Sequence, residues 1–377
     1  MKKFIALFLA LVMLMALATG CASSSQPSND AASNDTTASS SGDAEKDTTA
    51  DTTADTTADT APAGGYKIAL CNNSMSETWR VQMVAEFEQA AEAYKASGVI
   101  SEYYETNADA DASKQIADME DLIAKGVDGI LIAPQNPTAL NDVISEAMDA
   151  GIKVVVFNSY VDSSFTNYTA YVNQDGKEFG KINAQFLVDA LGGKGKIILL
   201  QGVAGNSVCI ERWEGAKEVF DQYPDIEIVG EANGNWDYAD GKAATEALLS
   251  ANPEIDGVWS QGGAMTQGAI DAFVAAGRPL VPMSGEAGNG FLASWIKYQG
   301  VDKFDSVAPL YDTGIVVDAL DILVRALNGE TVEKTNILPM DSITADTVSQ
   351  YYREDLPDSY WAGSRLSDEN LKKLFEN

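Results

Sequence analysis

Short apolar runs alternate with helix-period segments from residue 66 onward, and this alternation constrains the fold more than any other feature. Most of these runs are almost continuously apolar rather than alternating, which is typical of strands buried on both faces. Strands of this kind that alternate with helices predict an α/β fold of doubly wound parallel sheets. The runs are YKIAL (66–70), GILIAP (129–134), KVVVFNS (153–159), KIILLQG (196–202), DGVWSQG (256–262) and PLVPMSG (279–285).

Ligands of doubly wound sheets bind beyond the carboxyl ends of the strands. In this chain those ends carry Asn, Asp, Gln, Trp, Tyr and Arg, and the first of them, CNNSMSETWR (71–80), contains no glycine. Neither phosphate-binding pattern, GxxxxGK[ST] or GxGxxG, follows a strand. The sequence therefore predicts a polar and aromatic site, with no nucleotide cofactor.

The N-terminal residues 1–20, MKKFIALFLALVMLMALATG, have the pattern of an export signal. The following Cys21 resembles the lipidated cysteine of bacterial lipoproteins, although Ala18 stands where that motif usually has Leu. We expect a lipid on Cys21 that anchors the protein to the outer face of the cytoplasmic membrane. The alternative is ordinary signal cleavage near Ala22. No second apolar run reaches the ~18 residues of a membrane-spanning helix.

Residues 21–65 consist mainly of Ser, Thr, Asp and Ala, with TTAD repeated in tandem. Such a segment cannot bury enough apolar surface to fold, so we expect a disordered tether between the membrane and the folded part. The alternative is an acidic tail that binds a partner.

Composition excludes several functions. The net charge is −31 and no basic patch occurs, so we expect no nucleic-acid partner. The chain has no histidine, which excludes His-based triads, His metal sites and His proton relays. Cys71 and Cys209 lie beside candidate binding loops of different halves, so we expect no disulfide.

A metal site is not expected either. Asn107, Asp109 and Asp111 are spaced like the start of a calcium loop. However, Ala112 stands where that loop needs Gly, and Asp118 stands where it needs Glu. A helix N-terminus fits this stretch better.

Seven stretches between residues 66 and 345 occur in an order that resembles one protein family. They are IALCNNSMSETWRVQM, KQIADMEDLIAKGVDGILIAPQNPTAL, AGIKVVVFNS, LLQGVAGNSVCIERWEGAKE, ANGNWDYADGKAATEALL, DGVWSQGGAMTQGAIDAF and VAPLYDTGIVVDALDIL. The set resembles type I periplasmic-binding-type solute receptors, in the ribose/galactose-like branch that serves ABC sugar importers.

This resemblance implies two lobes joined by three crossings, near residues 172, 309 and 345, with the ligand enclosed when the lobes close. The N-terminal lobe would hold 66–172 plus 310–345. The C-terminal lobe would hold 173–309 plus 346–377.

The resemblance also implies ligand contacts in the N-terminal lobe. Trp79 matches an aromatic residue that stacks on the sugar, and Glu77 stands where the family often has Asn. Arg80 replaces a second aromatic residue. Asn158-Ser159 replaces the usual Asp-Arg pair. The alternatives are a core role for Trp79, helix capping by Glu77 and a surface ion pair of Arg80 with Glu77.

In the second lobe, Arg212 matches the sugar-binding arginine and Trp236 matches the second-lobe aromatic. The alternative for Arg212 is a helix-surface pair with Glu211 or Glu214. Asp237 beside Trp236 is a ligand acceptor or, more in keeping with its position, a helix N-cap. The remaining positions are Gln261, since Gly262 and Gly263 replace the usual polar pair, and Glu286, Tyr311 and Asp312.

These features predict a monomeric, extracytoplasmic receptor that binds a monosaccharide or small polyol and delivers it to the permease of an ABC importer. It would be neither an enzyme nor dependent on a cofactor. A sensing receptor that signals without transport is one alternative. A glycosidase that uses Glu77 and Glu286 is another, disfavoured by the absence of any nucleophile–base spacing.

Overall fold

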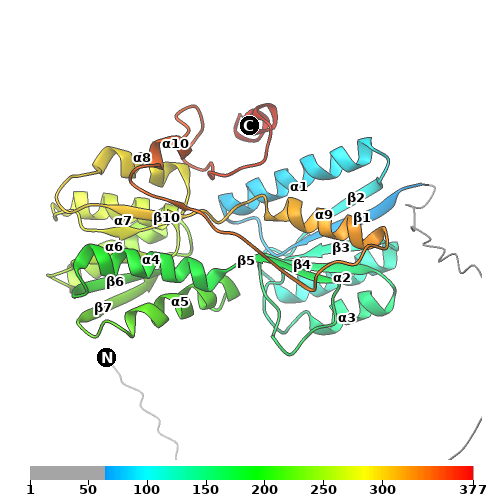
Figure 1. Cartoon of the computed structure of the whole chain (residues 1–377), viewed down its shortest axis with the longest axis horizontal. Helices are drawn as coiled ribbons and strands as arrows, with labels where there is room; N and C mark the ends of the chain where they lie inside the picture. Colours follow the sequence, from blue (N-terminus) through cyan, green and yellow to red (C-terminus); the bar gives the residue numbers. More distant parts are fainter. Residues whose placement is uncertain (1–63, 377) are drawn as a thin grey trace, which may run out of the picture. The chain divides into compact units, whose positions relative to one another are not determined.

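Two six-stranded sheets form the framework of residues 64–376, the part of the chain that the computed structural model describes (Figure 1). The first sheet is parallel throughout and has the strand order β11-β5-β4-β3-β1-β2. Its strands are β1 (Tyr66–Asn72), β2 (Ile100–Asn107), β3 (Gly129–Ile132), β4 (Lys153–Phe157), β5 (Ala170–Gln174) and β11 (Thr335–Leu338). The export signal, Cys21 and nearly all of the tether lie outside the described residues.

The second sheet has the order β12-β10-β9-β8-β6-β7, and only β12 runs antiparallel to its neighbour. Its strands are β6 (Gly195–Gln201), β7 (Ile226–Asn233), β8 (Gly257–Ser260), β9 (Met283–Ser284), β10 (Ser306–Pro309) and β12 (Ser342–Ile343). The predicted α/β architecture of two doubly wound lobes is therefore confirmed.

Helices cover both faces of the first sheet. Alternate residues of β1 pack to opposite sides: Ile68 and Leu70 belong to one buried cluster, Ala69 and Cys71 to another. The first cluster is covered by α1 (Thr78–Ala96) and α9 (Ile315–Leu327), the second by α2 (Ala112–Lys125) and α3 (Asn141–Asp149). Burying an apolar side chain of this size contributes roughly 1.5–3 kcal/mol, so both faces stabilise the strand.

The second sheet is covered in the same way. Ile198 and Leu200 pack against helices on one face, while Ile197 and Leu199 pack against helices on the other. The helices of the first face are α6 (Tyr238–Ala251), α7 (Gly263–Ala275) and α8 (Asn289–Tyr298), and those of the second face are α4 (Gly176–Leu191) and α5 (Ser207–Phe220). Two short helices follow near the C-terminus, α10 (Val348–Tyr351) and α11 (Asp368–Phe375).

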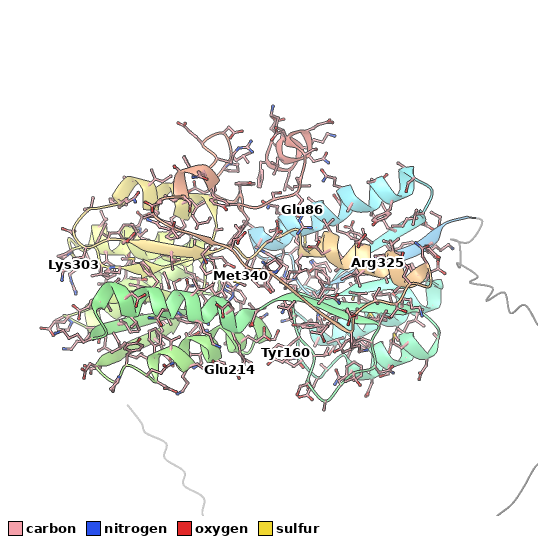
Figure 2. All side chains as sticks on the ribbon, viewed as in Figure 1. Glu86, Tyr160, Glu214, Lys303, Arg325 and Met340 are labelled. Atoms are coloured by element: carbon pink, nitrogen blue, oxygen red, sulfur yellow. The ribbon has the colours of Figure 1, made fainter. Side chains whose placement is uncertain are left out.

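The chain passes between the two sheets at three places: between β5 and α4, between β10 and α9, and between β11 and β12, where Met340 is labelled in Figure 2. The buried amide of Gln174 joins all three. It donates to the carbonyls of Leu310 (3.2 Å) and Pro339 (2.9 Å), and its oxygen accepts from the amide of Asp312 (2.7 Å). One side chain thus holds the three crossing segments together.

The C-terminal part of the chain differs from the predicted lobe boundaries. The third crossing lies at 339–341, a few residues before 345, because β12 pairs with β10 in the second sheet. Residues 346–377 were placed in the C-terminal lobe, yet Trp361 joins the buried cluster of α1 and α9, and Leu371 of α11 lies in a cluster with Ala85 of α1. This part of the chain contacts both lobes.

Candidate ligand-binding site

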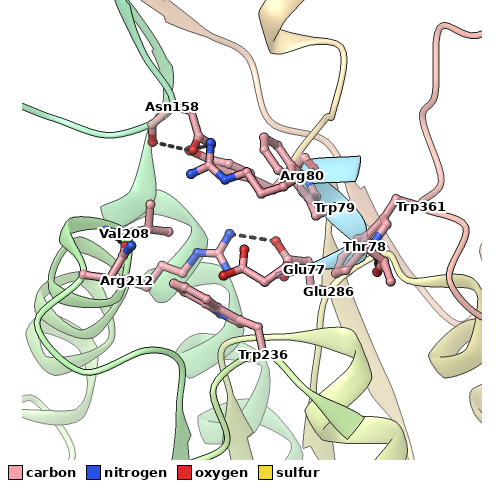
Figure 3. A pocket seen from close by; sticks show the side chains of 12 residues that line it. Glu77, Thr78, Trp79, Arg80, Asn158, Val208, Arg212, Trp236, Glu286 and Trp361 are labelled. Atoms are coloured by element: carbon pink, nitrogen blue, oxygen red, sulfur yellow. Dashed lines mark hydrogen bonds and ion pairs between the residues drawn. The ribbon is translucent and has the colours of Figure 1, made fainter. Parts of the chain in front are cut away.

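A pocket lies where the carboxyl ends of the two sheets meet (Figure 3). Its wall combines segments from both lobes: the first turn of α1, the end of β4, the start of α5, the loop before α6, the loop after β9 and the second crossing. The lining residues are Glu77, Thr78, Trp79, Arg80, Asn158, Asn206, Val208, Arg212, Trp236, Glu286, Tyr311 and Trp361.

A buried ion pair lines the pocket on the side of the C-terminal lobe. Arg212 Nη2 lies 2.7 Å from Glu286 Oε1, and the two side chains are only 3% and 5% exposed. Arg212 Nη1 donates to the carbonyl of Gln261 (2.5 Å), while its Nε is buried without a hydrogen-bond partner among the described residues. Burial raises the pKa of Glu286, and the neighbouring Arg212 opposes this rise. Arg212 thus pairs inside the pocket rather than with Glu211 or Glu214.

Two aromatic rings also pack against the guanidinium of Arg212. Arg212 Cζ lies 3.6 Å from the ring centroid of Phe179 and 4.9 Å from that of Tyr311. Contacts of a cation with aromatic faces in a desolvated site contribute about 2 kcal/mol or more. They fix the plane of the guanidinium, which is what directional recognition of a ligand requires.

Arg80 is a second buried arginine. It is 5% exposed, its Cζ lies 5.3 Å from the ring centroid of Trp79, and its Nη1 has no hydrogen-bond partner in the described part of the chain. No described carboxylate approaches its nitrogens within 4.0 Å, so the surface ion pair with Glu77 is absent. Burial lowers the pKa of Arg80, although the charge of Glu77 counteracts this.

Glu77 stands at the N-cap position of α1, but its side chain makes no capping hydrogen bond. Burial raises the pKa of this carboxyl group, and the nearby Arg80 and Arg212 oppose the rise. Its carboxylate is directed into the pocket (Figure 3) rather than used in the helix.

Trp79 satisfies both interpretations of its role. It is 7% exposed and belongs to the buried cluster of the N-terminal lobe, yet it also lines the pocket. Its Nε1 donates to the carbonyl of Tyr311 (3.0 Å), and the two rings lie 5.9 Å apart at 43°. The ring is therefore fixed in place at the second crossing.

Asn158 directly follows β4 and has a left-handed conformation, with φ of 60°. Non-glycine residues rarely adopt this conformation, and Asn tolerates it better than most. The backbone carbonyl of Asn158 accepts from Tyr311 Oη (3.2 Å), and its Oδ1 is buried without a partner among the described residues. An acceptor is thus held at the edge of the pocket.

Trp236 is fixed by close packing in the second lobe. It has a left-handed φ of 56°, and its Nε1 donates to the carbonyl of Gln261 (3.2 Å). A Cβ at Gly202 would lie 2.3 Å from the ring, and one at Gly262 would lie 2.7 Å from it. These glycines leave the space that the indole occupies.

Three predicted contacts do not line this pocket, because each side chain has a structural partner. Asp237 caps α6 by accepting from the amides of Ala239 and Asp240 (2.7 and 3.0 Å). The side-chain amide of Gln261 donates to Gln201 (2.5 Å) and to the carbonyl of Cys209 (3.1 Å). Asp312 forms an ion pair with Arg365 (2.9 Å).

Four lining residues were not predicted: Thr78, Asn206, Val208 and Trp361. Asn206 could have been found from the sequence, because Asn is a preferred N-cap residue and this one directly precedes α5. Its side chain accepts from the amide of Val208 (2.9 Å) and caps that helix. Cys71 and Cys209 are buried free thiols, and the described residues contain no cluster of metal-binding side chains.

A protein-family model described as "Periplasmic binding protein domain" matches residues 68–331. The chain belongs to this family. The family consists of binding proteins rather than enzymes, so the glycosidase alternative is not supported.

Relatives and solved structures agree with this family. A xylitol-binding protein of Mycolicibacterium smegmatis is 30% identical over 246 residues, which cover 64% of this chain and 68% of the relative. The ribose import binding protein of Bacillus subtilis is 29% identical over 230 residues, or 61% of this chain and 73% of the relative. A solute-binding protein from Bacillus halodurans with bound myo-inositol has a TM-score of 0.69 at 26% identity, covering 78% of this chain and 99% of that chain.

The buried Arg212–Glu286 pair of this periplasmic binding protein predicts how substitutions change its free energy of unfolding. Glu286→Ala removes the only ion-pair partner that the described residues give Arg212, and leaving a buried charge unpaired costs about 3–5 kcal/mol. Chemical denaturation followed by circular dichroism should show a loss of this size. The double variant Arg212→Met/Glu286→Leu should recover most of it, since it buries no charge.

The exposed pair Lys181–Glu218 is the matched control, and Glu218→Ala should change stability by less than about 1 kcal/mol. A Glu286→Ala variant as stable as the Glu218→Ala variant would contradict the importance of the buried pair.

Proposed function

We propose that this protein is an exported, lipid-anchored, monomeric receptor that captures a monosaccharide or small polyol between its lobes. It delivers the ligand to the permease of an ABC importer. The relatives named above bind xylitol and ribose, and a similar solved structure holds myo-inositol. These three ligands are small, neutral and rich in hydroxyl groups.

The proposal depends on a set of buried polar atoms in the residues that line this pocket, which have no hydrogen-bond partner within residues 64–376. They are Arg80 Nη1 and Asn158 Oδ1 from the N-terminal lobe and Arg212 Nε from the C-terminal lobe. An unpaired buried polar group costs about 1–3 kcal/mol, and more when it is charged. Ligand hydroxyl groups, which both donate and accept, would pair all three and join the lobes.

The rest of the pocket suits the other surface of a sugar. Trp79, Trp236 and Trp361 contribute flat apolar rings, which complement the C–H faces of a sugar or polyol.

The charges of the site favour a neutral ligand. Two arginines, Arg80 and Arg212, are balanced by two carboxyl groups, Glu77 and Glu286. Carboxylate and guanidinium groups each make paired hydrogen bonds to neighbouring hydroxyls. A sugar acid would add a third negative charge and upset this balance.

The anchor completes the proposal and rests on the sequence alone. Export is supported by the family, whose members are periplasmic, and by the signal-like residues 1–20. Attachment through a lipid on Cys21 would keep the receptor close to its permease. Within residues 64–376, no helix is both long and apolar enough to cross a membrane.

A thermal-shift screen of sugars, polyols, sugar acids and nucleosides tests the proposed function. A neutral sugar or polyol at about 100 times its Kd should add about 2.7 kcal/mol to the free energy of unfolding. The compound should be recovered unchanged after long incubation. A screen in which only charged compounds or nucleosides stabilise the protein, or in which product is released, would contradict the proposal.

Arg80 gives a sharper prediction. It lines the pocket at a position where the sugar receptors that this chain resembles have an aromatic residue. Ser159 stands where those receptors have an arginine. We infer that Arg80 supplies the missing guanidinium. Arg80→Ala should weaken binding of the ligand found in the screen about 10- to 150-fold, since a charge-assisted hydrogen bond contributes about 1.5–3 kcal/mol. Arg80→Lys should restore little, because an ammonium group lacks the planar fork.

Isothermal titration calorimetry of both variants measures these changes. Arg325→Ala is the control, because Arg325 lies on exposed α9 surface in an ion pair with Glu330 (2.9 Å) and should not affect affinity. Parent-like affinity in both Arg80 variants would show that Arg80 does not contact the ligand.

A further inference from the structure

The C-terminal strap, residues 353–366, lies beyond the family match at 68–331 and connects the two lobes. In Figure 1 it is the red segment between α10 and the C-terminal helix. It follows the three crossings of the chain between the sheets and is a fourth segment that connects the two lobes.

On the C-terminal lobe the strap is held at the start of α8, directly after the loop that carries Glu286. The side chain of Asn289 accepts from the amide of Arg353 (3.0 Å) and donates to the carbonyl of Leu356 (3.0 Å). The amide of Ala362 donates to the carbonyl of Ala287 (2.9 Å).

On the N-terminal lobe the strap is held by α1. The side-chain amide of Gln82 both donates to the carbonyl of Trp361 and accepts from its amide, each at 3.0 Å. One turn further on, the buried carboxylate of Glu86, labelled in Figure 2, accepts from Ser364 Oγ (2.8 Å) and from the amide of Arg365 (3.2 Å). Burial raises the pKa of Glu86.

These attachments place Trp361 in the wall of the pocket. The residue is 6% exposed, and its Nε1 donates to Thr78 Oγ1 (2.8 Å), the first residue of α1. On the other side its ring packs on Gly288, where a Cβ would lie 3.7 Å from the ring. Trp361 therefore fills the gap between the loops of Glu77 and Glu286 (Figure 3).

We propose that Trp361 is a specificity-determining residue, which closes one end of the pocket and limits the ligand to a single ring or a short polyol. The inference rests on the proposed function. The ring closes the pocket next to Thr78, so a larger ligand has no room to extend on that side. Backbone hydrogen bonds of Trp361 and Ala362 to the two lobes hold this part of the strap in place. The position of the ring therefore does not depend on its own side-chain contacts alone.

Calorimetric titrations with ribose, xylitol, D-allose, myo-inositol, sucrose and lactose test this assignment. Trp361→Ala should lower the affinity for the tightest-binding monosaccharide or polyol at least tenfold. It should also raise the ratio of disaccharide affinity to monosaccharide affinity at least tenfold. Trp361→Phe, which keeps a ring but loses the donor to Thr78, should shift the ratios in the same direction by less. It also keeps the test valid if the alanine variant folds poorly.

Leu366→Ala is the matched control, because Leu366 is buried in the strap (7% exposed) but does not line the pocket. It should leave the affinity ratios unchanged even if it lowers stability. Ratios within threefold of the parent in both Trp361 variants would overturn the assignment while leaving the proposed function intact. A parent protein that binds none of the six compounds and no other neutral sugar or polyol of the screen would instead overturn the proposed function, and the role of Trp361 with it.

Discussion

Burial of charge at the carboxyl ends of two parallel sheets is the constraint on which the site depends. Transferring an ion into a protein interior costs several kcal/mol, which only a partner with good geometry offsets. Arg212 meets this condition through Glu286 on one side, the Gln261 carbonyl on another, and the Phe179 and Tyr311 rings. The helix and loops that supply these partners must therefore fold together.

Tyr311 extends this constraint to the other lobe. Its ring contacts Arg212 of the C-terminal lobe, while its hydroxyl lies 2.7 Å from Asn173 Oδ1 and 3.2 Å from the carbonyl of Asn158 in the N-terminal lobe. It sits next to the crossing segments that Gln174 joins. A change in the angle between the lobes would thus alter the environment of the buried arginine, which couples ligand contacts to lobe movement.

The sequence predicted the interior of the sheets better than their edges. Strands β1, β3 and β4 lie inside the first sheet and read as continuous apolar runs. The edge strands β2 and β7 have exposed positions, as in ISEYYETN, and no such run. In PLVPMSG only two residues form β9, consistent with the lack of a backbone donor at Pro279 and Pro282.

Most of the predicted contacts that line the pocket lie where a strand ends or a helix begins, and their contact with a ligand stays a prediction. Gln261 and Asp312 lie at chain positions where the family has ligand contacts. Their side chains instead bond to Gln201 and Arg365 of distant segments, and neither lines the pocket. Trp361 could not be predicted, because no local pattern links residue 361 to α1. Its place depends on hydrogen bonds across about 280 residues of sequence.

We expect one ligand to bind both lobes at once, and an interlobe distance tests this most directly. Spin labels at Glu146→Cys on α3 and Glu218→Cys on α5 report this distance by pulsed electron paramagnetic resonance. Both sites are exposed, the thiols of Cys71 and Cys209 are buried, and Cys21 is replaced by Ala in the labelled protein. We expect saturating ligand to narrow the distance distribution and shift its population, because contacts from both lobes favour one interlobe angle. A distribution unchanged by a ligand that calorimetry shows to be bound would contradict the claim.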